Sequence, residues 1–193
     1  MKAPDLEEID AIARYCTAER PIASLLVLIG IPGSGKTTLA CTLAAQWPNC
    51  ETIATDAVRA ELYGDARIQG HWPQIEAHVE RRLAAIARRG SSRSRSRGHE
   101  NSGNLHGYPA TIYDATNVDR DHRRQAIARA RACGLTAVLG LWLDVPLAVA
   151  IERNRRRSRR VPDAVLEAMH RALKCCPPHP DDGFDRLWRC QLV

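Results

Sequence analysis

Short apolar runs alternate with amphipathic stretches along this chain. Residues 24–29 form a run with several branched side chains, which is typical of a strand buried on both faces of a parallel sheet. Further apolar segments follow at intervals. The pattern predicts strands at residues 24–29, 51–55, 110–113, 135–143 and 184–190.

Apolar residues at helical spacing fill the intervals between these runs and predict amphipathic helices. We expect helices over residues 5–19, 37–45, 74–89, 119–133 and 163–174, with shorter ones following Asp56 and Pro146. We therefore expect an α/β fold in which a single domain over residues 1–193 forms a three-layer sandwich around a central, mostly parallel sheet.

A glycine-rich loop joins the first predicted strand to the helix that follows it. Its glycines let successive backbone N–H groups converge on one anion, and the helix adds the partial positive charge of its amino terminus. Lys36 can reach the outer phosphates of a nucleotide, and the Thr37 hydroxyl is placed to ligate Mg²⁺. We interpret the loop as the phosphate-binding loop (P-loop) of a P-loop NTPase fold. The residues predicted to bind the nucleotide are Gly30, Pro32, Gly33, Ser34, Gly35, Lys36, Thr37 and Thr38.

A carboxylate follows the second predicted strand. Asp56 comes directly after residues 51–55, and residues just past the carboxyl ends of parallel strands line the ligand crevice. Arg59 lies one helical turn further on, on the same face. Asp56 is therefore a candidate catalytic residue with Arg59 beside it. The alternative is that Asp56 caps the following helix, a role that Asp often has and that is compatible with catalysis.

A second carboxylate, Asp114, ends the third predicted strand. An acidic residue at the end of an apolar strand in a P-loop protein is the usual place for a carboxylate that orients the Mg²⁺ shell, directly or through water. We therefore predict Thr37 and Asp114 as the metal site.

Residues 90–107 change composition abruptly. Ser and Arg alternate there with almost no apolar side chain, so the segment cannot offset the entropy of being ordered. We predict a flexible surface insertion over 90–107. A passive solvated loop is the favoured interpretation, and contact with nucleic acid or phosphorylation of its serines is the alternative.

Residues 153–160 contain six arginines in eight positions. As a merely solvated face such a run would repel itself. Next to a nucleotide site, guanidinium groups can neutralise the charge spread over a transferring phosphoryl group. We therefore predict a helical, arginine-rich lid at about residues 153–162.

Composition narrows the class of protein further. The formal net charge of +6 favours an anionic partner beyond the nucleotide without identifying it. The seven cysteines are scattered without a Cys-x-x-Cys pair, which argues against a zinc site or a disulfide framework and fits reduced thiols in a cytoplasmic protein. Residues 25–29 are far too short to span a bilayer, so no membrane partner is expected.

Taken in order, the motifs resemble the polynucleotide-kinase-like group of P-loop kinases. This group comprises small domains often labelled AAA-family ATPase and includes the kinase part of nucleic acid end-repair proteins. The resemblance spans most of residues 25–170 and rests on residues 30–38, 55–59, 114–117, 143–146 and 152–154 with 161–162.

The resemblance implies roles for individual residues. The aspartate that matches Asp56 is the general base on the acceptor hydroxyl, and the arginine that matches Arg59 contacts phosphate of the acceptor. The residues that match Lys36 and Thr37 hold the triphosphate and Mg²⁺. Lid arginines embrace the donor phosphates, and Arg153 and Arg157 are the best candidates; Arg157 is the one we assign to catalysis.

The predicted function is transfer of the γ-phosphoryl group of ATP, or alternatively GTP, to an alcohol. The acceptor favoured by the resemblance and the basic charge is the 5′-hydroxyl of a polynucleotide, and a small-molecule alcohol is the alternative. A different class of function is a nucleotide-hydrolysing switch or binding module without a hydroxyl acceptor. An inactive scaffold is the least favoured, and the sequence indicates no oligomeric state.

Overall fold

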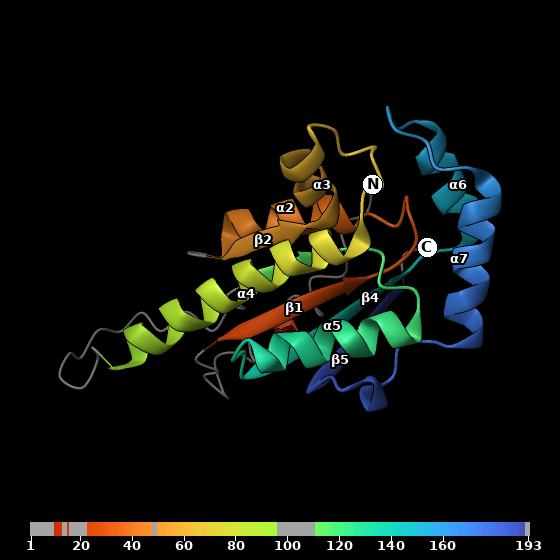
Figure 1. The fold of residues 1–193 in the computed structure, drawn as a ribbon. Helices are drawn as coiled ribbons and strands as arrows, with labels where there is room; N and C mark the ends of the chain where they lie inside the picture. Colours follow the sequence, from red (N-terminus) through yellow and green to blue (C-terminus); the bar gives the residue numbers. More distant parts are fainter. Residues whose placement is uncertain (1–9, 13–14, 16–22, 48–49, 96–110, 192–193) are drawn as a thin grey trace.

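The computed structural model describes residues 10–12, 15, 23–47, 50–95 and 111–191 and contains one parallel sheet (Figure 1). Its five strands lie in the order β2-β3-β1-β4-β5. The strands are β1 (Ser24–Ile29), β2 (Glu51–Ala54), β3 (Thr111–Asp114), β4 (Ala137–Asp144) and β5 (Arg186–Gln191). All four strand pairs are parallel, as the sequence predicts.

The central strand β1 is buried along its whole length. Alternate side chains of a strand point to opposite faces of the sheet. Accordingly, Leu25, Val27 and Ile29 belong to one hydrophobic cluster, and Leu26 and Leu28 to another. The sheet therefore has a core on both faces, which makes three layers.

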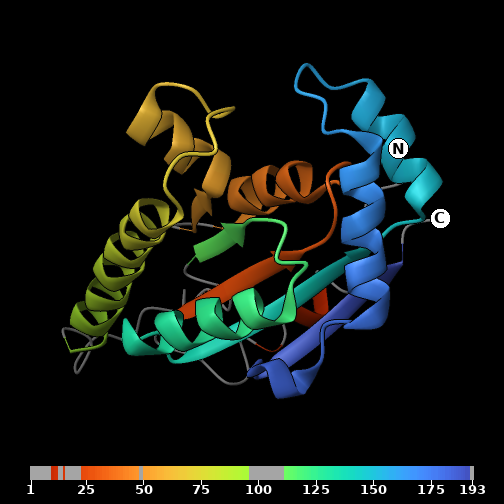
Figure 2. The same cartoon turned by 45° about the vertical axis from the view of Figure 1, so that its right-hand side comes forward.

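Helices cover both of these faces. The helices are α2 (Lys36–Gln46), α3 (Thr55–Tyr63), α4 (Trp72–Arg95), α5 (Arg120–Ala132), α6 (Leu147–Arg155) and α7 (Asp163–Cys175), with a 3₁₀ turn η1 (Pro180–Asp182). Helix α2 packs in the cluster that contains Leu26 and Leu28, whereas buried residues of α3 to α7 belong to the other cluster. Figure 2 shows α6 and α7 at the end of the sheet toward which the strands point.

Strand register brings the predicted site residues to one edge. Leu28 of β1 lies opposite Asp114 of β3, and Ala54 at the end of β2 lies opposite the same residue. The carboxyl edge of the sheet therefore carries the P-loop, Asp56 and Asp114. Ligands of parallel α/β proteins bind at this edge.

The structure corrects two predicted boundaries. Residues 90–95, expected in the flexible insertion, continue α4 to Arg95. Only Arg93 and Arg95 in this stretch are good helix formers, but extending an existing helix adds one hydrogen bond for each residue fixed. The lid is helical only as far as Arg155, and residues 156–162 form a loop before α7.

Other expectations fall partly on undescribed residues. The rest of the predicted insertion lies outside the described residues. Of the helix predicted over residues 5–19, the structure describes Asp10 to Ile12 and Tyr15, which are helical. The six cysteines in the described ranges form no disulfide. In the same ranges, no helix combines the length and the apolar character needed to cross a membrane.

Candidate active site

The P-loop leaves β1 and ends at the amino terminus of α2. Gly35 is the N-cap of α2 in the left-handed conformation with φ 98°, a region that favours glycine because it has no Cβ. No acidic residue lies in the first turn of α2. The partial positive charge of this helix end is therefore left for an external anion.

Gly33 packs the loop directly against the lid helix. A Cβ on Gly33 would lie 2.3 Å from the carbonyl oxygen of Ala150 in α6. Only glycine allows this close approach. The phosphate-binding loop and the helix that carries the lid arginines are consequently in backbone contact.

Lys36 lies inside the loop with its ammonium group held by loop oxygens. Its Nζ donates to the carbonyl of Ile31 at 2.9 Å and to Ser34 Oγ at 3.4 Å. Burial lowers the pKa of Lys36 from 10.5 to about 8. The negative charge of Asp114 raises this pKa, the positive charge of Arg157 lowers it, and the negative charge of Asp56 raises it. The charges of both predicted carboxylates and of one lid arginine therefore act on the Lys36 ammonium group.

Thr37 and Asp114 are in direct contact. Thr37 Oγ1 donates a hydrogen bond of 2.7 Å to Asp114 Oδ2, and Asp114 is only 6% exposed. The described residues contain no group of three or more His, Cys, Asp or Glu side chains suited to a metal. This pair nevertheless fits Mg²⁺, which is held by one or two protein oxygens and takes its remaining ligands from phosphates and water.

Asp56 lies in the first turn of α3 and does not cap it. The N-cap is Ala54, and no side chain accepts a capping hydrogen bond there. The Asp56 carboxylate instead forms ion pairs with Arg59 at 2.8 Å and with Arg159 of the lid loop at 3.0 Å. Half of its side chain remains exposed. The carboxylate is therefore positioned by two arginines and open to an incoming group.

Arg59 has an unused donor. Its side chain is 13% exposed, and its Nε is buried without a hydrogen-bond partner among the described residues. A buried donor left unpaired is costly, which makes a ligand oxygen a favourable occupant of this position.

The lid loop is tied at its two ends. The buried Asn154 side chain donates to the carbonyl of Val161 at 2.7 Å and accepts from the Val161 N–H at 3.1 Å. Within the lid, Arg155 pairs with Asp163 and Arg156 with Glu152. These contacts hold residues 155–160 as a compact loop over the carboxyl edge.

The remaining predicted residues occupy several positions. Arg157 is exposed, Arg153 is half-buried one turn beyond Ala150, and Thr38 is exposed on α2. Pro32 and Ser34 are buried in the loop, and the Gly30 N–H donates to the Thr116 carbonyl at 3.0 Å. The structure thus places Lys36, Thr37, Asp56, Arg59, Asp114 and Arg157 in one region. Among the described residues, no side-chain hydrogen bond or ion pair joins Thr38 or Arg153 to this group. The individual roles stay predictions.

Two residues that form contacts at the candidate site or in the lid loop have no role predicted from the sequence. Arg159 is one of the six lid arginines, and only its contact with Asp56 distinguishes it from the others. Asn154 interrupts the arginine run, and the resemblance includes residues 152–154 and 161–162 without giving Asn154 a role. Both contacts form only when the loop folds, so spacing alone could not specify them.

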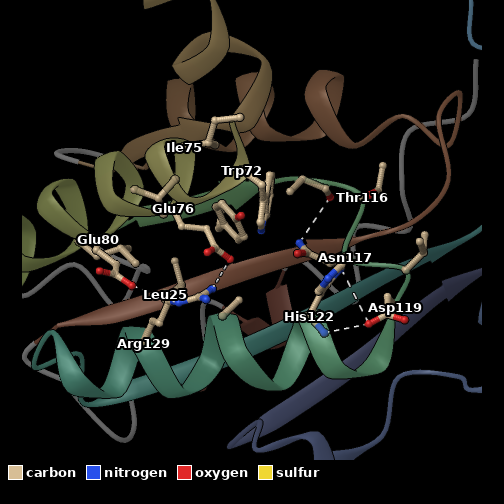
Figure 3. Close-up of a pocket in the computed structure, with 16 residues that line it drawn as sticks. Leu25, Trp72, Ile75, Glu76, Glu80, Thr116, Asn117, Asp119, His122 and Arg129 are labelled. Atoms are coloured by element: carbon tan, nitrogen blue, oxygen red, sulfur yellow. Dashed lines mark hydrogen bonds and ion pairs between the residues drawn. The ribbon is translucent and has the colours of Figure 1, made fainter. Parts of the chain in front are cut away.

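A groove lies beside this region, between α4 and α5 (Figure 3). It holds about 750 Å³ of space outside protein atoms, part of it open to solvent. One end is lined by Thr116 and Asn117, which follow Asp114. The groove therefore begins next to the P-loop contact at Gly30 and runs along the sheet. Of the motifs in the sequence, only residues 115–117 contribute to its lining.

Comparison with known proteins defines the fold more closely. A family model described as AAA domain matches residues 25–175. No curated protein sequence matches the chain.

Solved structures give three informative neighbours. The Pnkp1/Rnl/Hen1 RNA repair complex contains a chain with TM-score 0.61 and 20% identity, and the match covers 79% of this chain but only 44% of that one. A gluconokinase from Sinorhizobium meliloti has TM-score 0.52 and 19% identity, covering 90% of this chain and 85% of that one. A sugar kinase from a Janibacter species has TM-score 0.51 and 21% identity, covering 88% and 85%. At these identities the likeness establishes the fold.

Proposed function

Since this chain belongs to the AAA domain family and has the fold of P-loop kinases, we propose that it is an ATP-dependent kinase that phosphorylates a hydroxyl group. One observation carries the proposal. The Asp56 carboxylate, held by Arg59 and Arg159, shares the carboxyl edge of the sheet with the P-loop and acts electrostatically on Lys36. A nucleotide switch needs the P-loop but has no use for a base in this position.

Each residue has a defined part in the proposed transfer. Asp56 accepts the proton of the acceptor hydroxyl as its oxygen attacks the γ-phosphorus in line, and the bond from that phosphorus to the bridging oxygen of ATP breaks. Lys36 and the N–H groups at the start of α2 hold the triphosphate. Arg157 and Arg153 approach it from the lid and stabilise the charge on the transferring group.

Mg²⁺ supplies further neutralisation of the phosphate charge when bound, and Thr37 and Asp114 are the residues that hold it. Arg159 connects the lid to Asp56, so lid position and base position are coupled. Closure of the lid over the carboxyl edge of the sheet excludes water, which otherwise competes with the alcohol as phosphoryl acceptor.

Two classes of acceptor remain to be compared. A polynucleotide 5′-hydroxyl is supported by the net charge of +6 and by the arginine-rich lid. A small-molecule alcohol is supported by the groove beside the P-loop, which has a largely apolar lining with a few polar side chains.

Transfer of labelled γ-phosphate from ATP to a panel of acceptors tests the proposal. The panel contains 5′-hydroxyl DNA and RNA, nucleosides, sugars and amino alcohols, with Asp56→Asn as the control. Label in any alcohol that disappears with Asp56→Asn supports the kinase. ATP hydrolysis that no hydroxyl compound affects and that a protein stimulates would favour the switch.

The salt dependence of acceptor affinity distinguishes the two classes of acceptor. A single strand contacted at about four phosphates should lose roughly fifty-fold in affinity between about 50 and 200 mM salt, from a slope of about −0.7 per phosphate. An uncharged alcohol should lose far less over the same range.

A further inference from the structure

The groove between α4 and α5 lies outside the residues to which the proposed mechanism gives a role. We propose that it is the acceptor site and that it selects a small alcohol carrying a protonated amine over neutral and anionic alcohols. This inference rests on the proposed kinase function, because it assigns the acceptor of that same reaction.

The position of the groove connects it to the transfer site. Thr116 and Asn117 line one end, and the Thr116 carbonyl accepts the N–H of Gly30 in the P-loop. Tyr113, which also lines the groove, directly precedes Asp114 at the end of β3. A molecule seated in the groove therefore has one end beside the carboxyl edge of the sheet, from which the P-loop and α3 also begin.

The charge on the groove wall is predominantly negative. Glu76, Glu80 and Asp119 line it together with a single guanidinium, that of Arg129. Arg129 pairs with Oε1 of Glu76 at 2.6 Å and with Oε1 of Glu80 at 3.1 Å. One guanidinium can neutralise only one of the two glutamates, so this part of the groove wall keeps a net negative charge.

Tyr113, which is largely buried, gives a second indication of a ligand. Tyr113 is 7% exposed and lines the groove, and its hydroxyl has no hydrogen-bond partner among the described residues. A tyrosine hydroxyl can donate to, or accept from, a polar group of a bound molecule.

The mouth of the groove offers aromatic rings. Trp72 begins α4 with 37% of its surface exposed, and its ring lies 6.4 Å from that of His122 at an interplanar angle of 35°. Figure 3 shows both side chains at the end of the groove that also holds Thr116 and Asn117. An indole face attracts an ammonium group and also packs against apolar or flat bodies.

Together these features match one ligand chemistry. The floor is apolar, formed by residues such as Leu25, Ile75 and Val79, and suits a hydrocarbon body. The excess of carboxylates in the lining and an exposed indole favour an ammonium group, whereas a phosphate or carboxylate would meet like charges. A polynucleotide strand therefore does not suit the groove.

Three alcohols that differ in one group test the selectivity. 2-Amino-1-phenylethanol, 1-phenylethanol and mandelate share a phenyl ring and a benzylic hydroxyl, and they carry an ammonium, a methyl and a carboxylate group. Binding to the full chain is measured by quenching of tryptophan fluorescence, with Trp72→Phe identifying the signal of the groove. The amine should bind about tenfold more tightly than the neutral alcohol, and mandelate should bind least.

Two variants link the preference to the groove. Glu76→Gln should remove most of the tenfold preference for the amine, and Tyr113→Phe should weaken all three compounds by a few-fold. Glu167→Gln makes the same chemical change on the exposed surface of α7 and should alter none of the affinities. If Glu76→Gln folds poorly, the weaker binding expected for Tyr113→Phe still tests whether the compounds occupy the groove.

The outcomes separate this inference from the kinase proposal. Mandelate binding as tightly as the amine, a preference that survives Glu76→Gln, or binding of none of the three at millimolar concentration overturns the acceptor site. So does phosphorylation of a 5′-hydroxyl oligonucleotide that the groove variants leave unaffected. In each of those cases an Asp56-dependent transfer to some alcohol still supports the kinase. If the amine binds but no alcohol is phosphorylated, the groove remains an amine-binding site and the kinase proposal is rejected.

Discussion

Asp56 shows how a single side chain acquires a function from its neighbours. Its position in the first turn of α3 would suit a helix cap, yet it makes no capping hydrogen bond. Its oxygen Oδ1 instead receives both Arg59 and Arg159. Two guanidinium groups on one carboxylate oxygen orient the side chain and leave the other oxygen for an acceptor.

Asp56→Asn should retain ATP binding and lose phosphoryl transfer. The amide preserves the shape of the side chain but cannot take a proton, and a general base contributes about 10²–10⁴-fold to a rate. Single-turnover transfer of labelled phosphate and ATP titration measure the two properties separately. Arg59→Lys serves as the control, since it keeps a cation beside the carboxylate. Normal transfer by Asp56→Asn would remove the general-base assignment.

Lys36 should make ATP affinity depend on pH. The pKa of its ammonium group is lowered to about 8, so the group is charged below that pH and loses its charge above it. A triphosphate binds the charged form, and affinity should therefore decline above about pH 8, approaching tenfold per pH unit. Calorimetric titration between about pH 7 and 9.5 measures this.

The matched variant for this pH dependence is Lys36→Arg. Its guanidinium stays charged throughout the range, so its affinity should vary little with pH even if it is weaker overall. An affinity of the unmodified protein that stays constant to pH 9.5 would contradict the assignment of Lys36 to the phosphates.

At the scale of elements, the P-loop and the lid behave as one unit. Gly33 lies against the backbone of α6, and α6 carries Arg153 and leads into the lid loop. Asn154 then closes that loop onto Val161 just before α7. We therefore expect a nucleotide bound at the P-loop to affect the lid through this backbone contact.

Gly33→Ala should displace α6 and weaken ATP binding. The added Cβ would meet the Ala150 carbonyl at 2.3 Å, in addition to the cost of a left-handed residue with φ 84°. Gly64→Ala is the control, because Gly64 has φ 78° and its Cβ would meet nothing within 4 Å. We expect the control to lose about 1 kcal/mol in urea unfolding and Gly33→Ala at least about 2 kcal/mol more. Equal losses would show that the contact with α6 is unimportant.

Asn154→Ala should loosen the lid loop. It removes two hydrogen bonds to the backbone of Val161, and we expect a loss of about 1–3 kcal/mol in the free energy of unfolding. Trypsin should then cleave faster at the lid arginines, which mass spectrometry of the fragments locates. Asn154→Asp keeps an acceptor for the Val161 N–H and should give an intermediate result. Lid cleavage at the unmodified rate in Asn154→Ala would refute the role.

At the scale of the whole molecule, local patterns and long-range contacts differ in how far they could be predicted. The parallel sheet and the P-loop are determined by neighbouring residues, such as the buried run Ser24–Ile29 followed by glycines, and both are confirmed. The Thr37–Asp114 contact agrees with the prediction because strand ends meet at one edge. The contact between Arg159 and Asp56 spans about half of the chain and leaves no pattern in the sequence.

Arg123 is the clearest case of a residue that its pattern misrepresents. It lies among other charged residues of α5, a pattern typical of a solvated helix face, yet it is fully buried. It donates to the carbonyls of Asn117, Val118 and Cys176 and pairs with Asp182 at 2.9 Å. Its burial depends on partners from three separate segments, so periodicity within one helix could not reveal it.

Asp182 should therefore control the stability of the whole domain. Burial by itself raises its pKa, but hydrogen bonds from Arg123 and Arg120 outweigh this and hold the pKa below its ordinary value of 3.8. Asp182→Asn leaves the Arg123 charge buried without a counter-ion, which should cost about 3–5 kcal/mol in urea unfolding at pH 7. Asp181→Asn is the matched control: its side chain is 75% exposed and pairs only with His179 among the described residues, so a change within about 0.5 kcal/mol is expected.

The pH dependence of this difference tests the cause. Because the folded-state pKa of Asp182 is lowered, its contribution is present above pH 3.8 and is lost as the pH falls through the folded-state value. The gap in unfolding free energy between the natural protein and Asp182→Asn should therefore be largest near neutral pH and should narrow below about pH 4. A gap that stays constant down to pH 3 would mean that the charge of Asp182 does not hold η1 and α5 together, and that packing around Arg123 does so instead.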